Sequence, residues 1–167
     1  MTRRILRLSI PFAAALLSFT TASWAQDAET GARFELFGGR VEPTDSDADF
    51  HTESYGLRGG YRFNNRWALE GTAARLDTDL DAWFGDLSAK AYFFHLDRFE
   101  MYALGGAGVY KVEDDYEKAT LHVGIGAEIG LTQNIYLRPE ARGRWIADEL
   151  KADEGLAEYS LGIGWRF

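Results

Sequence analysis

The chain has no cysteine, and its 167 residues include only three prolines and three histidines. Without cysteine, disulfide bonds and thiol chemistry are both excluded. Lysine and arginine are outnumbered by aspartate and glutamate, 18 to 26, which gives a formal net charge of −8. Such an acidic chain argues against nucleic acid as a partner, because phosphate binding needs a basic surface. What is abundant instead is glycine, with 18 residues, and aromatic residues, at 14%.

A long hydrophobic run is also missing after residue 25, and this excludes a transmembrane helix there, which needs about 18 consecutive apolar residues. Residues 1–25 have the layout of a secretory signal peptide. Three arginines precede a short apolar run, and Ser23 and Ala25 place small residues at a cleavage site. We therefore expect a mature domain over residues 26–167, with a net charge of −11, because the removed segment holds three arginines and no acids.

The last twelve residues alternate strictly between two kinds of side chain. One face carries Ala157, Tyr159, Leu161, Ile163, Trp165 and Phe167. The other face carries Glu158, Ser160, Gly162, Gly164 and Arg166. This alternation predicts a β-strand with one apolar face and one polar or small face. An aromatic ending is typical of a strand in a membrane barrel, where aromatic side chains lie at the rim.

Seven other segments repeat this pattern, so the sequence predicts eight strands. Their ranges are 32–41, 53–63, 66–76, 86–95, 99–111, 119–131, 135–146 and 156–167. The connections alternate between long acid-rich loops and short turns. Eight strands of about ten residues suit a tilted membrane crossing, with short periplasmic turns and longer outer loops. The predicted fold class is all-β: an eight-stranded antiparallel up-and-down transmembrane β-barrel.

Two of these segments are irregular. In residues 86–95 aromatic side chains occupy both faces, which weakens the alternation. Pro139 lies within residues 135–146 and cannot donate to a ladder of hydrogen bonds, so it predicts a bulge or a local gap in that strand.

The polar face of the strands is predicted to line the bore. It is rich in glycine, as a crowded interior requires, and it carries charges of both signs. Long charged side chains among small residues can fill an eight-stranded bore, and they must be paired, because an isolated buried charge is very costly. The predicted lumen network is Glu35, Arg58, Arg62, Glu70, Lys90, Glu128, Arg138, Glu140, Arg142, Arg144, Glu158 and Arg166. A bore packed in this way is not an open pore.

Aromatic residues near the strand ends predict two girdles at the membrane interfaces. These are Tyr55, Phe63, Trp67, Phe93, Tyr102, Tyr110, Trp145, Tyr159, Trp165 and Phe167. Together with the glycine-rich polar face, the girdles favour a membrane barrel over a soluble barrel, in which the apolar face would point inward.

Four stretches carry a resemblance to a known group of proteins. They read YALGGAGVY at 102–110, GIGAE at 124–128, LRPEAR at 137–142 and GIGWRF at 162–167. The mature chain resembles the small eight-stranded outer-membrane β-barrels of Gram-negative bacteria, the superfamily of OmpA-like and OmpX/Ail-like barrels. The resemblance implies an outer-membrane location, a monomer without a cofactor, and contact with outer-membrane lipid and lipopolysaccharide. It also implies that Ile163, Trp165 and Phe167 form a signal for the barrel-assembly machinery.

Metal and catalytic sites are not expected. Residues 45–49 and 77–81 both read D-x-D-x-D, but neither has the glycine and glutamate that a calcium loop of the EF-hand type needs at its sixth and twelfth positions. A lipid deacylase would need histidine, serine and an acid together on the lipid face. We expect His51 in a loop, His95 at the periplasmic end and His122 in the lumen.

The predicted function is therefore non-enzymatic: a structural or surface-interaction role, in membrane integrity or adhesion, with loops that contact a host or surface ligand. Two alternatives stay open from the sequence. One is a narrow porin-like channel for small solutes. The other is a soluble periplasmic barrel that binds lipid.

Overall fold

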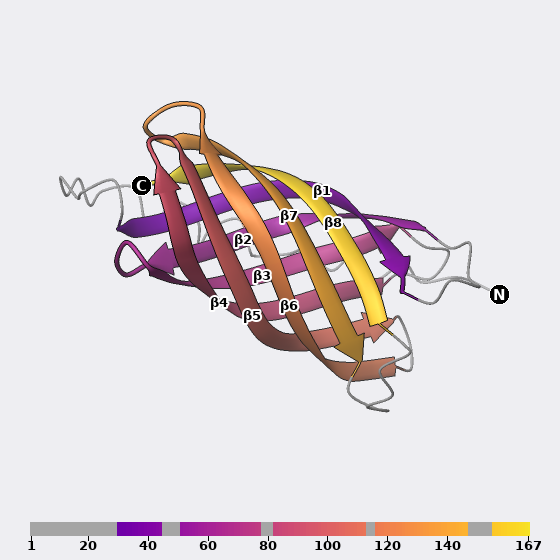
Figure 1. The fold of residues 1–167 in the computed structure, drawn as a ribbon. Coiled ribbons are helices and arrows are strands. Elements are labelled where there is room, and N and C mark those ends of the chain that lie inside the picture. The colour runs from indigo at the N-terminus through magenta and orange to yellow at the C-terminus, as the bar shows by residue number, and fades with distance from the viewer. Residues whose placement is uncertain (1–29, 45–50, 78–81, 113–115, 147–154) are drawn as a thin grey trace, which may run out of the picture.

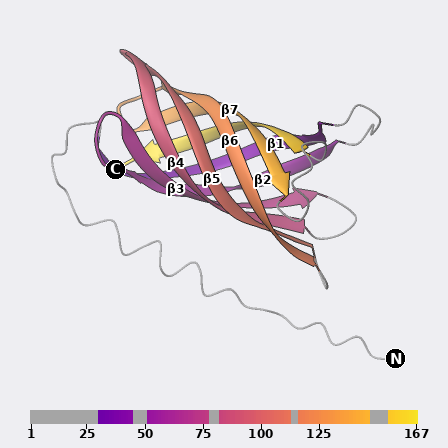
Figure 2. The same cartoon turned by 60° about the horizontal axis from the view of Figure 1, so that its bottom comes forward.

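The computed structural model describes residues 30–44, 51–77, 82–112, 116–146 and 155–167. Within these residues the strands are β1 (Gly31–Pro43), β2 (Thr52–Arg62), β3 (Trp67–Asp77), β4 (Ala82–Leu96), β5 (Phe99–Val112), β6 (Tyr116–Gly130), β7 (Ile135–Ile146) and β8 (Gly155–Arg166). Each strand pairs antiparallel with the next, and β8 pairs with β1, so the sheet closes into a barrel (Figures 1 and 2). The predicted fold class is confirmed. The predicted signal peptide, residues 45–49 and residues 78–81 lie outside the described residues.

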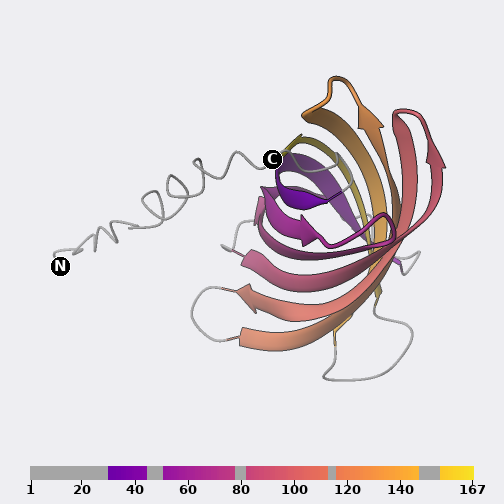
Figure 3. The same ribbon diagram turned by 90° about the vertical axis from the view of Figure 1, so that its left-hand side faces the viewer.

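The two ends of the barrel differ. The short connections β2–β3, β4–β5 and β6–β7 lie at the same end as the C-terminus (Figure 1). We call this the turn end and the opposite end the loop end. The strands curve around the barrel axis, and the hairpins β4–β5 and β6–β7 project at the turn end (Figure 3). Among the described residues, no helix is long and apolar enough to cross a membrane.

The predicted strand ranges agree with the structure to within two residues, except at the starts of β4 and β6. β4 begins at Ala82 and β6 at Tyr116, so both loops are shorter than predicted. The start of β4 was hidden because acids and Gly85 surround it, a composition typical of a loop. Cross-strand pairing decides otherwise: Trp83 is paired with Arg75 of β3 and with Lys111 of β5.

Apolar side chains point outward and charged side chains point inward. Leu57 and Leu161, for example, are 45% and 58% exposed on the outer surface. Lys90 and Arg138 are buried inside the barrel. This arrangement is the inverse of a soluble barrel and matches a sheet whose outer face meets lipid.

β5 corrects the sequence prediction for two of the girdle residues. Tyr102 and Leu104 are buried inside the barrel, whereas Gly105 lies on the outer face. Tyr102 is therefore not a girdle residue, and neither is Tyr110, which packs against Phe84 inside the barrel at a ring separation of 4.9 Å. The interior of the barrel has to be filled, and Tyr102 points inward where its neighbour Gly126 leaves room for the ring.

A β-bulge in β4 explains why aromatic residues occupy both of its faces. Tyr92 is paired with Tyr102, but the next pair is Phe94 with Met101, so Phe93 is an extra residue. A bulge changes the parity of the strand. Phe93 and Phe94 are both exposed as a result.

Pro139 produces a gap rather than a bulge, one of the two predicted outcomes. Towards β8 the ladder is continuous, and Pro139 is paired with Leu161. Towards β6 the pairing stops at Glu140 and resumes at Leu137 with the register unchanged. The missing N–H donor of proline accounts for this interruption.

Placing a charge on the outer face in mid-strand should destabilise the barrel. We expect Leu161→Arg to lower the free energy of unfolding by about 2–4 kcal/mol, because the guanidinium would face hydrocarbon. The measurement is urea unfolding in lipid vesicles. Phe63→Arg, at the turn end, is the matched control and should cost about 1 kcal/mol or less. Equal costs for the two variants would contradict the assignment of the outer face.

Candidate functional site

The bore of the barrel contains a large group of buried charged side chains. All twelve residues of the predicted lumen network take part in its ion pairs. Ten of them are buried, and Glu158 and Arg166, near the two ends of β8, are partly exposed. The alternation of the strands brings them inward from β1, β2, β3, β4, β6, β7 and β8.

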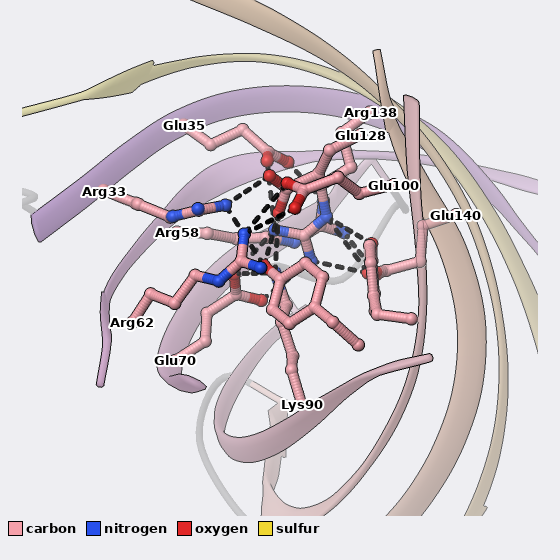
Figure 4. Close-up of polar contacts among 12 residues, drawn as sticks. Arg33, Glu35, Arg58, Arg62, Glu70, Lys90, Glu100, Glu128, Arg138 and Glu140 are labelled. Carbon is pink, nitrogen blue, oxygen red and sulfur yellow. Dashed lines mark hydrogen bonds and ion pairs between the residues drawn. The ribbon is translucent and has the colours of Figure 1, made fainter. Parts of the chain in front are cut away.

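Arg138 of β7 is the centre of this group (Figure 4). Its Nη1 lies 2.6 Å from Glu70 Oε2 and 3.0 Å from Glu35 Oε2. Its Nη2 lies 2.5 Å from Glu140 Oε2, and its Nε donates a hydrogen bond of 2.6 Å to Tyr102 Oη. One fully buried guanidinium thus contacts three carboxylates from three strands.

Further cations satisfy the same carboxylates. Glu70 also accepts from Lys90 Nζ at 2.6 Å. Arg58 Nη1 lies 2.5 Å from Glu35 Oε1, and Arg58 Nη2 lies 3.1 Å from the carboxylate of Glu140. Because each carboxylate meets at least two cations, the attraction offsets part of the cost of removing these charges from water.

A second cluster lies on the turn side of Arg138. Glu128 is ion-paired with Arg33 and, at 3.2 Å, with Arg166. It also accepts a hydrogen bond of 2.6 Å from Tyr92. Glu100, which the sequence analysis did not select, lies 2.9 Å from Arg62 (Figure 4).

A third cluster lies on the loop side. Both carboxylate oxygens of Asp86 lie 2.7 Å from the guanidinium of Arg144. Arg144 is also ion-paired with Glu158, and it donates a hydrogen bond of 3.0 Å to Thr120. This bidentate geometry is the strong form of an arginine–carboxylate contact.

An apolar cluster lies inside the barrel at the loop end. Its buried members are Val41, Leu76, Ala82 and Phe84, and partly buried residues such as Tyr110 pack against it. The guanidinium carbon of Arg144 lies 4.0 Å from the centre of the Phe84 ring, so this apolar cap sits directly on the loop-side ion pairs. An apolar constriction disfavours water and ions.

Several bore residues escaped the sequence analysis for different reasons. Asp86 shares parity with Ser88 and Lys90, so parity was an available signal for this acid. Glu100 shares parity with Tyr102, which was predicted to lie in a girdle, so parity gave the wrong face for Glu100.

For the apolar cap the signals conflicted. Val41 and Leu76 share parity with buried acids, but apolar side chains on a strand of this fold suggest lipid contact. Ala82 and Phe84 had no signal, because they precede the predicted start of their strand.

A histidine, a serine and an aspartate lie close together in the bore, but they do not have the geometry of a catalytic triad. His122 Nε2 lies 2.8 Å from Ser88 Oγ, but His122 Nδ1 lies 3.9 Å from Asp86 and makes no hydrogen bond. All three side chains are buried inside the barrel. Among the described residues, no cluster of histidine and carboxylate side chains has the arrangement of a metal site.

The predicted assembly-signal residues lie on the outer face of β8 and just beyond it. Ile163 and Phe167 are 39% and 69% exposed, and Trp165 is partly exposed. The backbone N–H of Phe167 donates to Ala32 O at 3.0 Å. This hydrogen bond holds the backbone of Phe167 beside β1, while its aromatic ring is exposed on the outer surface.

Residues 12–167 match the family described as the outer membrane protein beta-barrel domain. The β-barrel domain of Pseudomonas aeruginosa OprF is similar in structure, with a TM-score of 0.66 and 14% identity over 83% of this chain and 99% of that domain. Neisserial surface protein A is similar with a TM-score of 0.66 and 16% identity, over 82% of this chain and 97% of that protein. Ail, the attachment invasion locus protein of Yersinia pestis, is similar with a TM-score of 0.58 and 20% identity, over 85% of this chain and 100% of that protein. At these identities the similarity concerns the fold. No curated protein matches the sequence.

Removing the central cation should be far more damaging than removing an exposed one. We expect Arg138→Ala to lower the free energy of unfolding by about 3–5 kcal/mol, because three buried carboxylates lose their shared partner. Urea unfolding in vesicles measures this. Arg40→Ala breaks an exposed pair with Glu42, and should cost about 1 kcal/mol or less. A small cost at Arg138 would show that the network is not stabilised as a unit.

Proposed function

Because the chain belongs to the outer membrane protein beta-barrel domain family, we propose that it is an integral outer-membrane protein with a closed bore and a structural or surface-interaction role. The observation that carries this proposal is the arrangement around Arg138, whose contacts with Glu35, Glu70 and Glu140 fill the middle of the barrel. The family and the similar barrels support the outer-membrane location.

The closed bore follows from two obstacles in series. Ions would first have to pass the apolar cap around Phe84, where there is little to replace their hydration. They would then have to separate Arg138 from carboxylates at 2.5–3.0 Å, which leaves buried charges without partners. Next to the loop-side ion pairs, a cavity lined by Arg58, Thr72 and Arg144 has a volume of only ≈ 10 Å³, about the space for one water molecule.

In this proposal the network acts as the core of the protein. A barrel whose apolar face is turned to lipid cannot fill its interior with the same side chains, so paired charges and tyrosines take that place. Such a network ties together strands that are not neighbours in the sheet, because Arg138 of β7 needs partners on β1 and β3.

The surface-interaction part of the proposal concerns membrane integrity or adhesion through the acid-rich loops. It is supported by the fold shared with Ail, which is named as an attachment invasion protein, and with Neisserial surface protein A. We propose no enzymatic activity and no cofactor. The buried position of Ser88 and His122, away from the lipid-facing surface, supports this view.

Conductance separates the closed barrel from a narrow channel. The refolded wild-type protein in a planar bilayer should give no steady single-channel steps, because the ion pairs and the apolar cap occupy the bore. A porin inserted under the same conditions serves as the positive control. Heat-modifiable gel migration of the same sample confirms that the barrel is folded. Steady steps from folded protein would refute the closed bore.

We further propose that Ile163, Trp165 and Phe167 are read by the barrel-assembly machinery. Phe167→Ala should then reduce the amount of heat-modifiable barrel in the cell membrane fraction several-fold. In vitro it should change the free energy of unfolding by only about 0.5 kcal/mol, because the ring is exposed. Phe63→Ala, at the same end of the barrel, is the control and should leave assembly unchanged.

Two outcomes would count against these proposals. Equal assembly of the Phe167 and Phe63 variants would remove the assembly role. Release of the wild-type protein into the aqueous periplasm without detergent would contradict the outer-membrane location and favour a soluble lipid-binding barrel.

A further inference from the structure

Two buried polar groups on adjacent strands of the bore have no hydrogen-bonding partner among the described residues. They are the Nε of Arg58, on β2, and the Oγ1 of Thr72, on β3. Arg58 and Thr72 are only 3% and 8% exposed, so neither is in open contact with bulk water. Buried polar groups in folded proteins nearly always have a partner, which is often an ordered water molecule.

Strand register places these two residues side by side and adds an acid to them. Thr72 is paired with Arg58 of β2 on one side and with Asp86 of β4 on the other. All three residues are buried inside the barrel and line one cavity, whose volume is ≈ 10 Å³. That volume is close to the smallest space that holds one water molecule.

The remaining contacts of Arg58 fix its guanidinium at the wall of this cavity. Its Nη1 lies 2.5 Å from Glu35 Oε1, and its Nη2 donates a hydrogen bond of 2.9 Å to Ser160 Oγ. The centre of the Phe37 ring lies 3.7 Å from the guanidinium carbon. The side chain is therefore held in place by its other atoms, while its Nε–H still needs an acceptor.

We propose that the cavity binds one water molecule, which bridges Arg58 Nε, Thr72 Oγ1 and the carboxylate of Asp86. The water oxygen accepts the hydrogen bond from Arg58 Nε, because a guanidinium nitrogen can only donate. The Thr72 hydroxyl can donate or accept, and a hydrogen of the water is donated to the carboxylate. About three partners are usual for a buried water molecule.

The chemistry of the cavity wall favours water over an ion. Arg58, Arg142 and Arg144 all line the cavity, which excludes a cation. An anion would lie against the carboxylates of Asp86 and Glu158, which line it as well. The three arginines already have carboxylate partners, so none of them is left for a halide. A halide is also larger than a water molecule.

A water molecule at this place is enclosed on both sides. Val41 and Phe84 belong to the apolar cap and also line the cavity towards the loop end. Towards the turn end, Arg58 joins the cavity to the central group through Glu35 and Glu140. Exchange of the water requires the cap or the ion pairs to separate. Its long residence rests on the proposed closed bore, whereas occupancy of the site does not.

A high-resolution crystal structure of the folded protein tests the site. The wild type should show density for one water molecule within hydrogen-bonding distance of Arg58 Nε and Thr72 Oγ1. Thr72→Ile removes the hydroxyl and fills the cavity with a methyl group, so this density should be lost. Thr72→Ser keeps the hydroxyl and should keep the water. Thr52→Ile is the matched control, because Thr52 is a buried threonine of β2 that does not line the cavity.

Oxygen-17 relaxation dispersion of the refolded protein in detergent micelles tests the enclosure. This measurement counts water molecules that stay bound for longer than the protein takes to rotate. Thr72→Ile should lower the count by one relative to the wild type, and Thr52→Ile should leave it unchanged. Heat-modifiable gel migration confirms that each variant is folded.

Four results would contradict the proposal. A wild-type cavity without density would show that it is dry. Density that persists in the Thr72→Ile variant would show that Thr72 does not hold the water. An anomalous peak in the cavity after a bromide soak would assign the site to an anion. A water seen in the crystal but too short-lived to be counted in solution would refute the enclosure, and with it the closed bore, but not the site.

Discussion

The structure depends on one constraint: a charge enclosed by this barrel can be compensated only by other side chains that point inward. Arg138 shows the consequence most clearly, since it is fully buried and contacts Glu35, Glu70 and Glu140 at 2.5–3.0 Å. Removal from water costs several kcal/mol per ion, so such charges are tolerated only when partners and hydrogen bonds surround them. Two of these partners, Glu35 and Glu70, lie on strands that are distant from β7 in sequence, and the network is therefore satisfied only when the barrel closes.

The same constraint explains the small residues inside the barrel. Long arginine, glutamate and tyrosine side chains need space that their neighbours leave open. An added Cβ at Gly162 would collide with Glu35, and one at Gly126 would collide with Tyr102. The interior glycines thus give the charged and aromatic side chains room to meet.

Local irregularities of the strands serve the interior rather than disturb it. Tyr92, just before the bulge, points inward and donates to Glu128. The bulge at Phe93 then brings His95 back to the mouth of the bore, 3.1 Å from Arg62. The gap beside Pro139 interrupts the ladder to β6 without shifting its register. The residues on either side of the gap therefore still point as the network requires.

The sequence by itself determined the eight strands, their order and the face of most of them, because alternation has a period of two and acid-rich loops separate the segments. It also identified the twelve network residues as inward-facing charges, from Glu35 to Arg166. Only the tertiary structure decided which of them pair, that Glu100 and Asp86 join them, and that Tyr102 lies inside. β5 carries few charges to mark its inner face, and the β4 bulge shifts parity. The apolar cap around Phe84 was also decided by the tertiary structure, since residues 82–85 read as a loop in the sequence and only pairing with β3 and β5 extends β4 over them.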